Sequence, residues 1–406
     1  MKRIHKPNQK SKNKIFYSFF FMIILIFFSL LYLSYHITSK FQKESQSEHA
    51  KKFLEIHRYD YTPDEKTLTI IARSFYPLKR NNTERENNHN LYFPCFPGEN
   101  NQNKKGADLK GLIYVKIHKS SSSTLAGINL RIAHRHGSSA GKACAAHYEH
   151  KTAKQLKLSN RDVTKTFLWT FVRQPQSLSI SRLFFFDVTR GKLILNNTTK
   201  SDDHVIQHLK RKKDDNVSFK YLDPFSSDLN TLKKIPHNIK RVINTYDFIG
   251  IADERFDESL VALRLLLGLS ASDIIYVRSK VGGSYDNAFD RHSCIKTAPS
   301  FVTESMKKYY SSQDFYSKHK SDFLLYSAVN RSLDLTIEKI GISRFQIALK
   351  EHKYLMSLVD KMCAPVAKFP CSIEGKHQAK LAKKNCYKYD YGCGYPCLDK
   401  LHENVS

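Results

Sequence analysis

The sequence predicts an α/β protein in which helices flank a central parallel sheet, preceded by a membrane-spanning helix near the N-terminus. Two observations predict this architecture. From Gly111 onward, short apolar runs alternate with segments of helical periodicity, which is the pattern of a parallel sheet with helices on its faces. Before them, residues 15–35 form an uncharged apolar run, long enough to cross a bilayer as a helix of about 20 residues.

The N-terminal apolar run is predicted to be a retained signal-anchor. Lysine and arginine crowd residues 1–14, whereas the first charge after the run is Lys40, so residues 1–14 are expected to stay cytoplasmic. A cleaved signal peptide is the alternative, but its apolar region is shorter, about 7–15 residues, and small residues follow at the cleavage site. The pattern therefore indicates a single-pass type II membrane protein with a lumenal C-terminal part.

The charge balance narrows the class of partner. The chain has 66 Lys and Arg against 38 Asp and Glu, a formal net charge of +28, which indicates an anionic partner. Nucleic acid, a membrane surface, a nucleotide and an acidic glycan all fit this charge. A lumenal location argues against nucleic acid, because the secretory pathway holds little of it. Nucleotide cofactors and anionic sugars remain.

Two regions flank the alternating part. Residues 36–108 are polar and rich in Lys, Glu, Asn and Gln, and are predicted to be a stem. Residues 346–406 carry most of the 8 cysteines and are predicted to be a disulfide-stapled tail in an oxidising lumen. A zinc site is the alternative, although the paired C-x2-C spacing is absent. Glycosylation acceptors, which agree with a lumenal location, occur at Asn81, Asn196, Asn197, Asn216, Asn330 and Asn404.

The first strand is predicted at residues 111–117, GLIYVKI, a short apolar run suited to a buried parallel strand. Leu125, Ile128 and Ile132 then recur at spacings of three and four residues. This spacing predicts a helix that ends near Gly137.

A second strand and helix follow. Residues 167–172, FLWTFV, predict another buried strand, and residues 175–188 predict a helix with Pro175 in its first turn. Residues 189–240 are basic, polar and poorly periodic, so we expect a surface excursion there.

The remaining elements continue the alternation. Residues 246–253 predict a third strand, and Asp257 to Leu267 a helix closed by Gly268. Residues 273–279, DIIYVRS, predict a fourth strand. Residues 300–340 are predicted to be mostly helical.

The loop after the first strand has the composition of an anion site. Residues 116–125 read KIHKSSSSTL, between an apolar strand and a helix. Backbone N–H groups at a helix start lack intrahelical partners and carry the positive end of the helix dipole. Lys119 adds a cation, and Ser120 to Thr124 add hydroxyl groups. The ATP-binding P-loop pattern is absent, and a solvated serine linker is the alternative.

A second phosphate-binding element follows the second strand. Arg173 ends the strand, and Ser181 lies inside the following helix. A guanidinium and a hydroxyl at a strand–helix junction are suited to binding a phosphate group. The alternative is an arginine in a surface salt bridge.

These two stretches and a third resemble Golgi carbohydrate sulfotransferases. KIHKSSSSTL is similar to that family's Lys-x-His-Lys-Thr-Ala-Gly-Ser-Thr-Leu loop, and VRQPQSLSIS is similar to its Arg-Asp-Pro segment with a downstream serine. Residues 247–277, built around FDESLV at Phe256–Val261, resemble a block in galactose-3-O-sulfotransferases. The resemblance covers about residues 111–340.

The resemblance implies a P-loop-like sulfotransferase fold over residues 109–345 and 3′-phosphoadenosine 5′-phosphosulfate (PAPS) as the donor, with no metal. It implies that the first loop binds the 5′-phosphosulfate, with Lys119 stabilising charge on the leaving oxygen. Arg173 and Ser181 match the 3′-phosphate site. The residues that match the family's donor site are His118, Lys119, Ser120, Ser121, Ser122, Ser123, Thr124, Arg173 and Ser181.

The sequence departs from the family pattern at two places. Ser121 and Ser122 stand where the family has Ala and Gly, so a loop position that needs a positive φ would be strained. Gln174 replaces an Asp, which removes a carboxylate that could orient Arg173.

A histidine between the two motifs is expected to be the general base. Related sulfotransferases place a catalytic His in this interval, which makes His147 the first candidate and His150 the second. His118, inside the loop, is expected to orient the donor. Arg278 and Lys280 follow the predicted fourth strand and are further candidates for the cofactor site.

The resemblance therefore implies a Golgi membrane enzyme that transfers a sulfuryl group from PAPS to a glycan hydroxyl, with the 3-OH of galactose as the favoured acceptor. Two alternatives stay open. One is a uronyl 2-O-sulfotransferase that acts on glycosaminoglycan-like chains, which the basic composition would suit. The other is a glycan-binding relative without catalytic activity. A nucleotide kinase is a distant third. The acceptor, the cysteine pairing and the oligomeric state are left open by the sequence.

Overall fold

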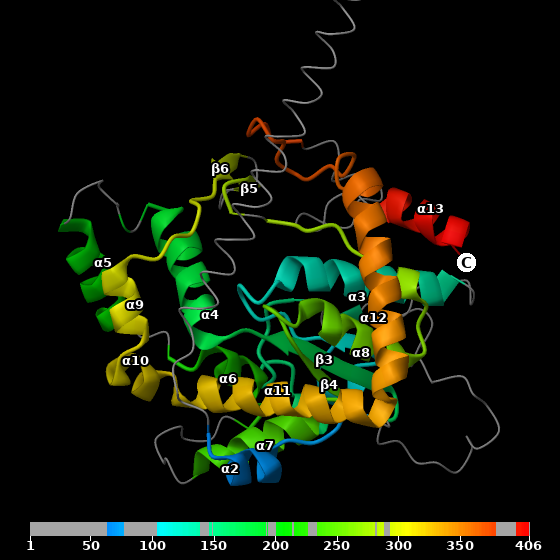
Figure 1. Cartoon of the computed structure of the whole chain (residues 1–406), viewed down its shortest axis with the longest axis horizontal. Helices are drawn as coiled ribbons and strands as arrows, with labels where there is room; N and C mark the ends of the chain where they lie inside the picture. Colours follow the sequence, from blue (N-terminus) through cyan, green and yellow to red (C-terminus); the bar gives the residue numbers. More distant parts are fainter. Residues whose placement is uncertain are drawn as a thin grey trace, which may run out of the picture. The chain divides into compact units, whose positions relative to one another are not determined.

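The structure is a computed structural model, and it describes a folded part of the chain (Figure 1). The described residues are 63–76, 104–138, 146–147, 149–191, 193, 200–212, 215–225, 234–280, 282–287, 293–378 and 395–405. The expected cytoplasmic tail at 1–14 and membrane-spanning segment at 15–35 lie outside them. Within the described ranges, no helix combines the length and the apolar character needed to span a bilayer.

A four-stranded parallel sheet forms the centre of the fold. Its strands are β1 (Gly111–Tyr114), the two-residue β2 (Ala146–His147), β3 (Thr166–Val172) and β4 (Phe248–Ile251), in the order β2-β1-β3-β4. All three pairings are parallel, and every residue of β1, β3 and β4 is buried. The predicted α/β class with a parallel sheet is confirmed.

The strand order creates a switch point between β1 and β3. From β1 the chain moves outward to β2 on one side, and then returns to place β3 on the other side. Parallel sheets bind ligands in the crevice at the carboxyl ends of the strands where the order reverses. The loop after β1 and the residue after β3 therefore meet at this crevice.

Helices pack around the sheet (Figure 1). Long α11 packs against β4, α7, α8 and α12, and α12 packs in turn against α8. The bounds of the longer helices are α3 Ser122–Ser138, α4 Pro175–Arg182, α5 Lys200–Arg211, α7 Ile235–Thr245, α8 Phe256–Leu267, α11 Lys320–Ile340, α12 Ile342–Leu358 and α13 Tyr395–Val405. The shorter helices are α2 Glu65–Ile71, α6 Val217–Leu222, α9 Glu304–Tyr310 and α10 Gln313–Lys318.

The helix signals in the sequence are largely confirmed. Pro175 occupies the start of α4, which continues as a wider π-helical turn over Leu183–Val188. Gly268 caps α8 in the left-handed conformation, at φ +65°. Residues 300–340 form α9, α10 and α11, as expected.

The predicted surface excursion at 189–240 is wrong for much of that stretch. It contains α5, α6 and the start of α7, which contribute buried apolar side chains to the fold. In α7, Ile235, Ile239 and Val242 recur at helical spacing and are at most 4% exposed. The many lysines and arginines on the outer faces of these helices conceal this periodicity in the sequence.

The predicted fourth strand at 273–279 is also wrong. The segment opens with a 3-10 turn at Ala271–Asp273 and then runs extended, without a strand partner among the described residues. Hydrogen bonds from Arg131 of α3 stand in for those of a neighbouring strand: its Nη1 donates to the carbonyls of Ser272 at 2.6 Å and Ile275 at 3.4 Å. This guanidinium is buried and also pairs with Asp399 of α13, at 3.0 Å.

Part of the predicted stem packs on the folded unit. Leu68 and Ile71 of α2, and Phe75 after it, belong to the hydrophobic core. The Phe75 N–H donates to Thr336 of α11 at 2.9 Å, and Arg73 donates to the carbonyl of Tyr246 at 2.7 Å. Residues 63–76 are therefore an integral part of the fold.

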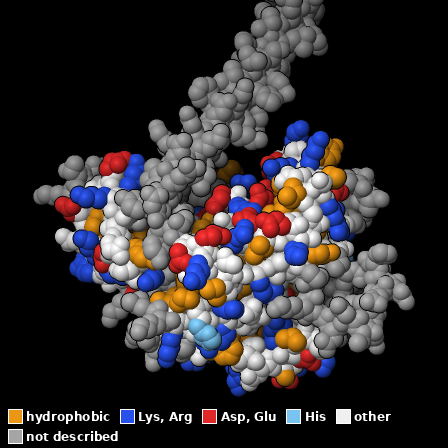
Figure 2. Space-filling view, turned by 60° about the horizontal axis from the view of Figure 1, so that its bottom comes forward, with side chains coloured by type: hydrophobic (Ala, Val, Ile, Leu, Met, Phe, Trp, Pro, Cys, Tyr) orange, Lys and Arg blue, Asp and Glu red, His pale blue; other side chains and the backbone are white. Residues whose placement is uncertain are grey.

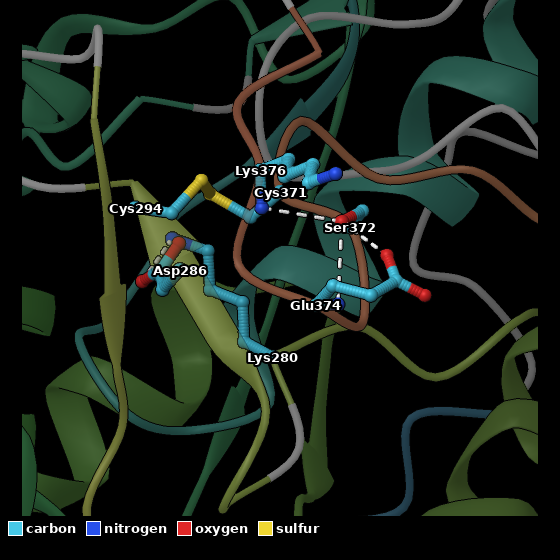
Figure 3. The surroundings of a disulfide bond; sticks show 7 residues. All are labelled: Lys280, Asp286, Cys294, Cys371, Ser372, Glu374 and Lys376. Atoms are coloured by element: carbon cyan, nitrogen blue, oxygen red, sulfur yellow. Dashed lines mark hydrogen bonds and ion pairs between the residues drawn. A yellow bond between two sulfur atoms is a disulfide. The ribbon is translucent and has the colours of Figure 1, made fainter.

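The prediction of disulfides in the tail is confirmed for two pairs. Cys363 bonds to Cys397, which holds α13 against the π-helical turn Val359–Cys363 that continues α12. Cys294 bonds to Cys371 and so ties the tail to the antiparallel hairpin β5 (Tyr285–Asn287) and β6 (Cys294–Lys296) (Figure 3).

One expected glycosylation acceptor is engaged inside the fold. The Nδ2 of Asn216, the atom that carries a glycan, donates to the carbonyl of Lys318 at 3.0 Å. Its Oδ1 accepts from the N–H groups of Ser321 and Asp322, at 2.9 and 3.1 Å. Asn216 therefore joins α6 to the start of α11.

Gly250 of β4 lies where α8 and a neighbouring strand leave no room for a side chain. A Cβ on Gly250 would lie 2.7 Å from the Phe171 ring and 2.8 Å from the Cβ of Ser259. We expect Gly250→Ala to lower the free energy of unfolding by about 1–3 kcal/mol, the usual cost of overpacking. Chemical denaturation would measure this. Gly282→Ala is the control, because its Cβ would lie 3.9 Å from the nearest atom, and equal losses in both variants would contradict the packing argument.

Candidate anion-binding site

A cavity of about 500 Å³ opens at the carboxyl ends of β1, β3 and β4, at the switch point of the sheet. Its walls come from the loop after β1, the start of α3, α4, the end of β4 and the segment 276–280. The lining residues are His118, Lys119, Ser121, Ser122, Ser123, Thr124, His150, Arg173, Ser181, Phe185, Ala252, Asp253, Glu254, Phe256, Asp257, Tyr276, Arg278, Ser279 and Lys280.

The serine loop turns sharply into α3. Lys119 and Ser121 both adopt left-handed backbone conformations, at φ +63° and +53°. The strain expected at Ser121 is thus present, and the Ser121 Oγ donates to the carbonyl of Ala252 at 3.3 Å. The first helical hydrogen bond runs from Leu125 N to Ser121 O. The N–H groups in the first turn of α3 consequently have no intrahelical acceptor. They form the positive end of the helix dipole, which lies at the cavity.

Lys119 is the cation at the centre of the loop. Its Nζ lies 3.9 Å from the centroid of the Phe185 ring. Burial, together with the nearby charges of Arg173 and Lys280, lowers the pKa of Lys119 to about 8. Phe185 reaches this position from the π-helical turn that follows α4. The charged form of Lys119 is therefore disfavoured by burial and by neighbouring cations, and a bound anion would stabilise it.

Arg173 is fixed by partners from the ends of two other strands. Its Nε lies 2.8 Å from Asp253 Oδ1, beyond β4, and its Nη1 donates to the carbonyl of Lys119 at 2.9 Å. Asp253 also accepts from the Gln174 N–H at 3.2 Å. The carboxylate that Gln174 lacks is thus replaced by Asp253, which the sequence analysis did not identify.

Two histidines stack beside the loop. The rings of His118 and His150 lie 3.6 Å apart and nearly parallel. His150 Nδ1 lies 2.6 Å from the carbonyl of Lys116, which can only accept, so Nδ1 carries the proton and Nε2 carries the lone pair of the neutral ring. Burial and the charges of Arg182 and the surrounding lysines lower the pKa of His118 to about 4. His118 is neutral at physiological pH.

The acidic residues of the cavity wall are held by their own partners. Asp257 Oδ1 accepts from the Tyr276 hydroxyl at 2.9 Å and lies 3.3 Å from His352 Nε2. Although burial raises the pKa of Asp257, these hydrogen bonds lower it below its usual value overall. Glu254 accepts a hydrogen bond from the Tyr326 hydroxyl. These carboxylates are oriented within the wall.

The structure brings together most of the residues that the sequence singled out. His118, Lys119, Ser121 to Thr124, Arg173 and Ser181 all line the cavity, and so do Arg278 and Lys280. Ser120 does not, because its side chain is fully buried. This placement does not support the expected contact between the Ser120 hydroxyl and a bound donor molecule.

The two candidate bases are placed differently. His147 is the second residue of β2 and pairs in register with Ile113, and its side chain lies outside the described residues. His150 comes beyond the carboxyl end of β2 and lines the cavity. Sequence spacing could not separate them, because both lie in the same interval between the two motifs.

Basic side chains are spread over the molecular surface in Figure 2, interspersed with acidic ones. Among the described residues on this face, the basic side chains are scattered and the acidic ones gather near the centre of the view. The cavity combines instead the N-terminal end of a helix, hydroxyl groups and the cations Lys119, Arg173, Arg278 and Lys280. Within the described part of the chain, no cluster of His, Cys, Asp or Glu side chains suited to a metal ion is found.

Comparison with known proteins finds no matching family, no matching curated protein and no matching solved structure. The chemistry of the site therefore has to be argued from its own geometry, in which a helix N-terminus, hydroxyl groups and cations of the kind that suit a phosphate or sulfate group line one cavity.

The pKa of Lys119 predicts how anion binding depends on pH. Sulfate keeps its double charge from pH 6 to 9, so it reports on the protein alone. Below about pH 7 Lys119 is protonated and affinity should be constant; above its pKa of about 8, the free lysine is neutral and must take up a proton to bind the anion. We expect sulfate affinity to fall by up to about tenfold per pH unit there.

The unfolding temperature, measured at increasing sulfate concentrations and at each pH from 6 to 9, would give the sulfate affinity and its pH dependence. Lys119→Met should bind sulfate more weakly and lose the decline above pH 8. A decline centred near pH 6.5 would assign the effect to an imidazole and contradict the role given to Lys119.

Proposed function

We propose that this protein is a PAPS-dependent carbohydrate sulfotransferase anchored in the Golgi membrane. The observation that carries the proposal is the convergence of two separate motifs on one cavity. The loop at 116–124 and the Arg173–Ser181 element are far apart in sequence, yet both line the cavity at the switch point. A donor with phosphate groups at two ends requires two such elements. The two disulfides support an oxidising compartment.

The residues of the cavity fit a bisphosphorylated donor. The first turn of α3, with Ser122, Ser123 and Thr124, would hold the 5′-phosphate end, and Arg173 with Ser181 would hold the 3′-phosphate. Arg173 is already oriented by Asp253 and the carbonyl of Lys119. Binding therefore requires little reorganisation of the guanidinium.

The chemistry would be an in-line displacement. PAPS supplies the sulfuryl group, whose bond to the 5′-phosphate oxygen breaks as the acceptor oxygen bonds to sulfur. Lys119 would stabilise the negative charge that develops on the leaving oxygen, by analogy with phosphoryl transfer. His150 would take the acceptor hydroxyl proton on Nε2, while its Nδ1–H continues to donate to the carbonyl of Lys116. His147 remains the other candidate for the base.

Substitutions separate these roles. Lys119→Ala should lower sulfate transfer from labelled PAPS by about a hundredfold or more, because the leaving oxygen loses its cation. His150→Ala should lower the rate by about a hundredfold while binding of the product 3′-phosphoadenosine 5′-phosphate (PAP) stays within about twofold. Transfer assays over a panel of glycans, with PAP calorimetry, would measure both. Lys350→Ala and His237→Ala, at exposed positions on α12 and α7, are matched controls.

The outcomes distinguish the alternatives. If PAP fails to bind the wild-type protein, the enzyme proposal is wrong. If PAP binds but no glycan is sulfated, the non-catalytic relative is favoured. If His147→Ala loses activity and His150→Ala does not, the base is His147. Transfer to uronyl residues in preference to galactosides would favour the 2-O-sulfotransferase.

A further inference from the structure

A second cavity, of about 510 Å³, adjoins the anion-binding cavity. It lies between the β5–β6 hairpin and the tail segment 364–378, and Arg278 and Lys280 line both cavities. The two spaces therefore share a wall at the segment that follows α8 and its 3-10 turn. A ligand that occupied both cavities would contact these two cations.

The walls of the second cavity are fixed by a disulfide and by hydrogen bonds. Cys294 of β6 and Cys371 of the tail are joined by the disulfide, which clasps the two sides together (Figure 3). The tail turn is closed by backbone hydrogen bonds, from Ser372 N to Lys376 O at 2.9 Å and from Gln378 N to Pro370 O at 2.7 Å. The turn is also packed against Tyr285, because a Cβ on Gly375 would lie 2.5 Å from the Tyr285 ring.

The lining of the second cavity suits a sugar. Tyr285 and Phe369 are half-buried aromatic side chains in its walls, and rings of this kind pack against the C–H faces of pyranose sugars. Glu374 and Lys368 add polar groups that can bind hydroxyls. The Glu374 carboxylate is oriented by the Ser372 hydroxyl, at 2.6 Å (Figure 3).

The charges of this lining nearly cancel. Lys280 is paired with Asp286, at 3.1 Å (Figure 3). Arg278, Lys368 and Glu374 are the other charged residues of the lining. A polyuronide would need a surplus of cations along several sugar units, whereas a neutral saccharide needs hydrogen-bonding groups and an aromatic surface. The composition therefore favours a neutral glycan.

We propose that the cavity between the β5–β6 hairpin and residues 364–378 is the acceptor subsite, and that it binds a neutral oligosaccharide of at least two sugar units. This inference rests on the proposed function. The outer sugar packs on Phe369 and Tyr285, and the next sugar passes Arg278 and Lys280 to present its hydroxyl to the anion-binding cavity. The disulfide Cys294–Cys371 holds the two walls of the subsite at a fixed separation.

The test uses the full-length protein with lactose as the neutral probe and a non-sulfated glucuronyl-N-acetylglucosamine tetrasaccharide as the anionic one. Saturation-transfer NMR measures glycan binding without turnover, transfer assays give the acceptor KM, and calorimetry gives the PAP dissociation constant. Phe369→Ala removes the aromatic surface, and Ala367→Trp fills the cavity. Phe225→Ala is the control, because Phe225 is an exposed aromatic residue that lines neither cavity.

We expect Phe369→Ala and Ala367→Trp to weaken lactose binding and raise the acceptor KM by about tenfold, with PAP binding within about twofold of wild type and Phe225→Ala unchanged. Unchanged PAP binding shows that the variants are folded. Lactose binding unaffected by both substitutions in PAP-competent protein would overturn the subsite, and tighter binding of the tetrasaccharide than of lactose would overturn its neutral character.

Failure of the proposed function has a different signature. If wild-type protein neither binds PAP nor transfers sulfate, but lactose binding still falls in Phe369→Ala and Ala367→Trp with thermal unfolding unchanged, the second cavity is a glycan site of a non-enzymatic protein. Loss of lactose binding in the Phe225→Ala control as well would contradict the assignment of the site to this cavity.

Discussion

The contact between Arg173, Asp253 and the carbonyl of Lys119 organises the site. It joins residues that follow β3, β4 and β1, and so fixes the carboxyl ends of three neighbouring strands relative to one another. The left-handed turns at Lys119 and Ser121 place that carbonyl within reach of the guanidinium. This contact anchors the serine loop, which contains no glycine. A charge-assisted hydrogen bond and an ion pair thus lie next to the strained left-handed residues.

The cavity disfavours the protonated, charged forms of Lys119 and His118. Burial, with the nearby charges of Arg173 and Lys280, lowers the pKa of Lys119 to about 8, and burial with neighbouring cations lowers the pKa of His118 to about 4. The carboxylates in the wall are oriented by Arg173, Tyr276, His352 and Tyr326. An anion with two negatively charged ends would offset this repulsion, which is a physical reason for the site to favour such a ligand over a singly charged one.

The sequence predicts the parts of this fold that depend on local pattern. Buried strands and the loop and helix behind each can be recognised from apolar runs, Pro175 and Gly268. The segment 273–279 has the same apolar pattern but pairs with no strand in the part of the chain that the structure describes, and the side chain of Arg131 donates to the carbonyls of Asp273 and Ile275 within it. No spacing rule in the sequence reveals this side-chain contact. The role of Asp253 is equally hidden, since it depends on which strands are neighbours in the sheet. The second cavity could not be predicted, because it requires knowing that Cys294 pairs with Cys371.

Arg131 also makes the serine loop depend on a distant part of the chain. This buried guanidinium sits in the helix that carries the serine loop, and its acceptors include Leu398 and Asp399 of α13. A buried charge that loses its partners is strongly unfavourable. The helix behind the anion-binding cavity therefore relies on α13, which the disulfide Cys363–Cys397 holds in place. Removal of α13 would leave every residue of the serine loop present and yet take away the residues that seat its helix.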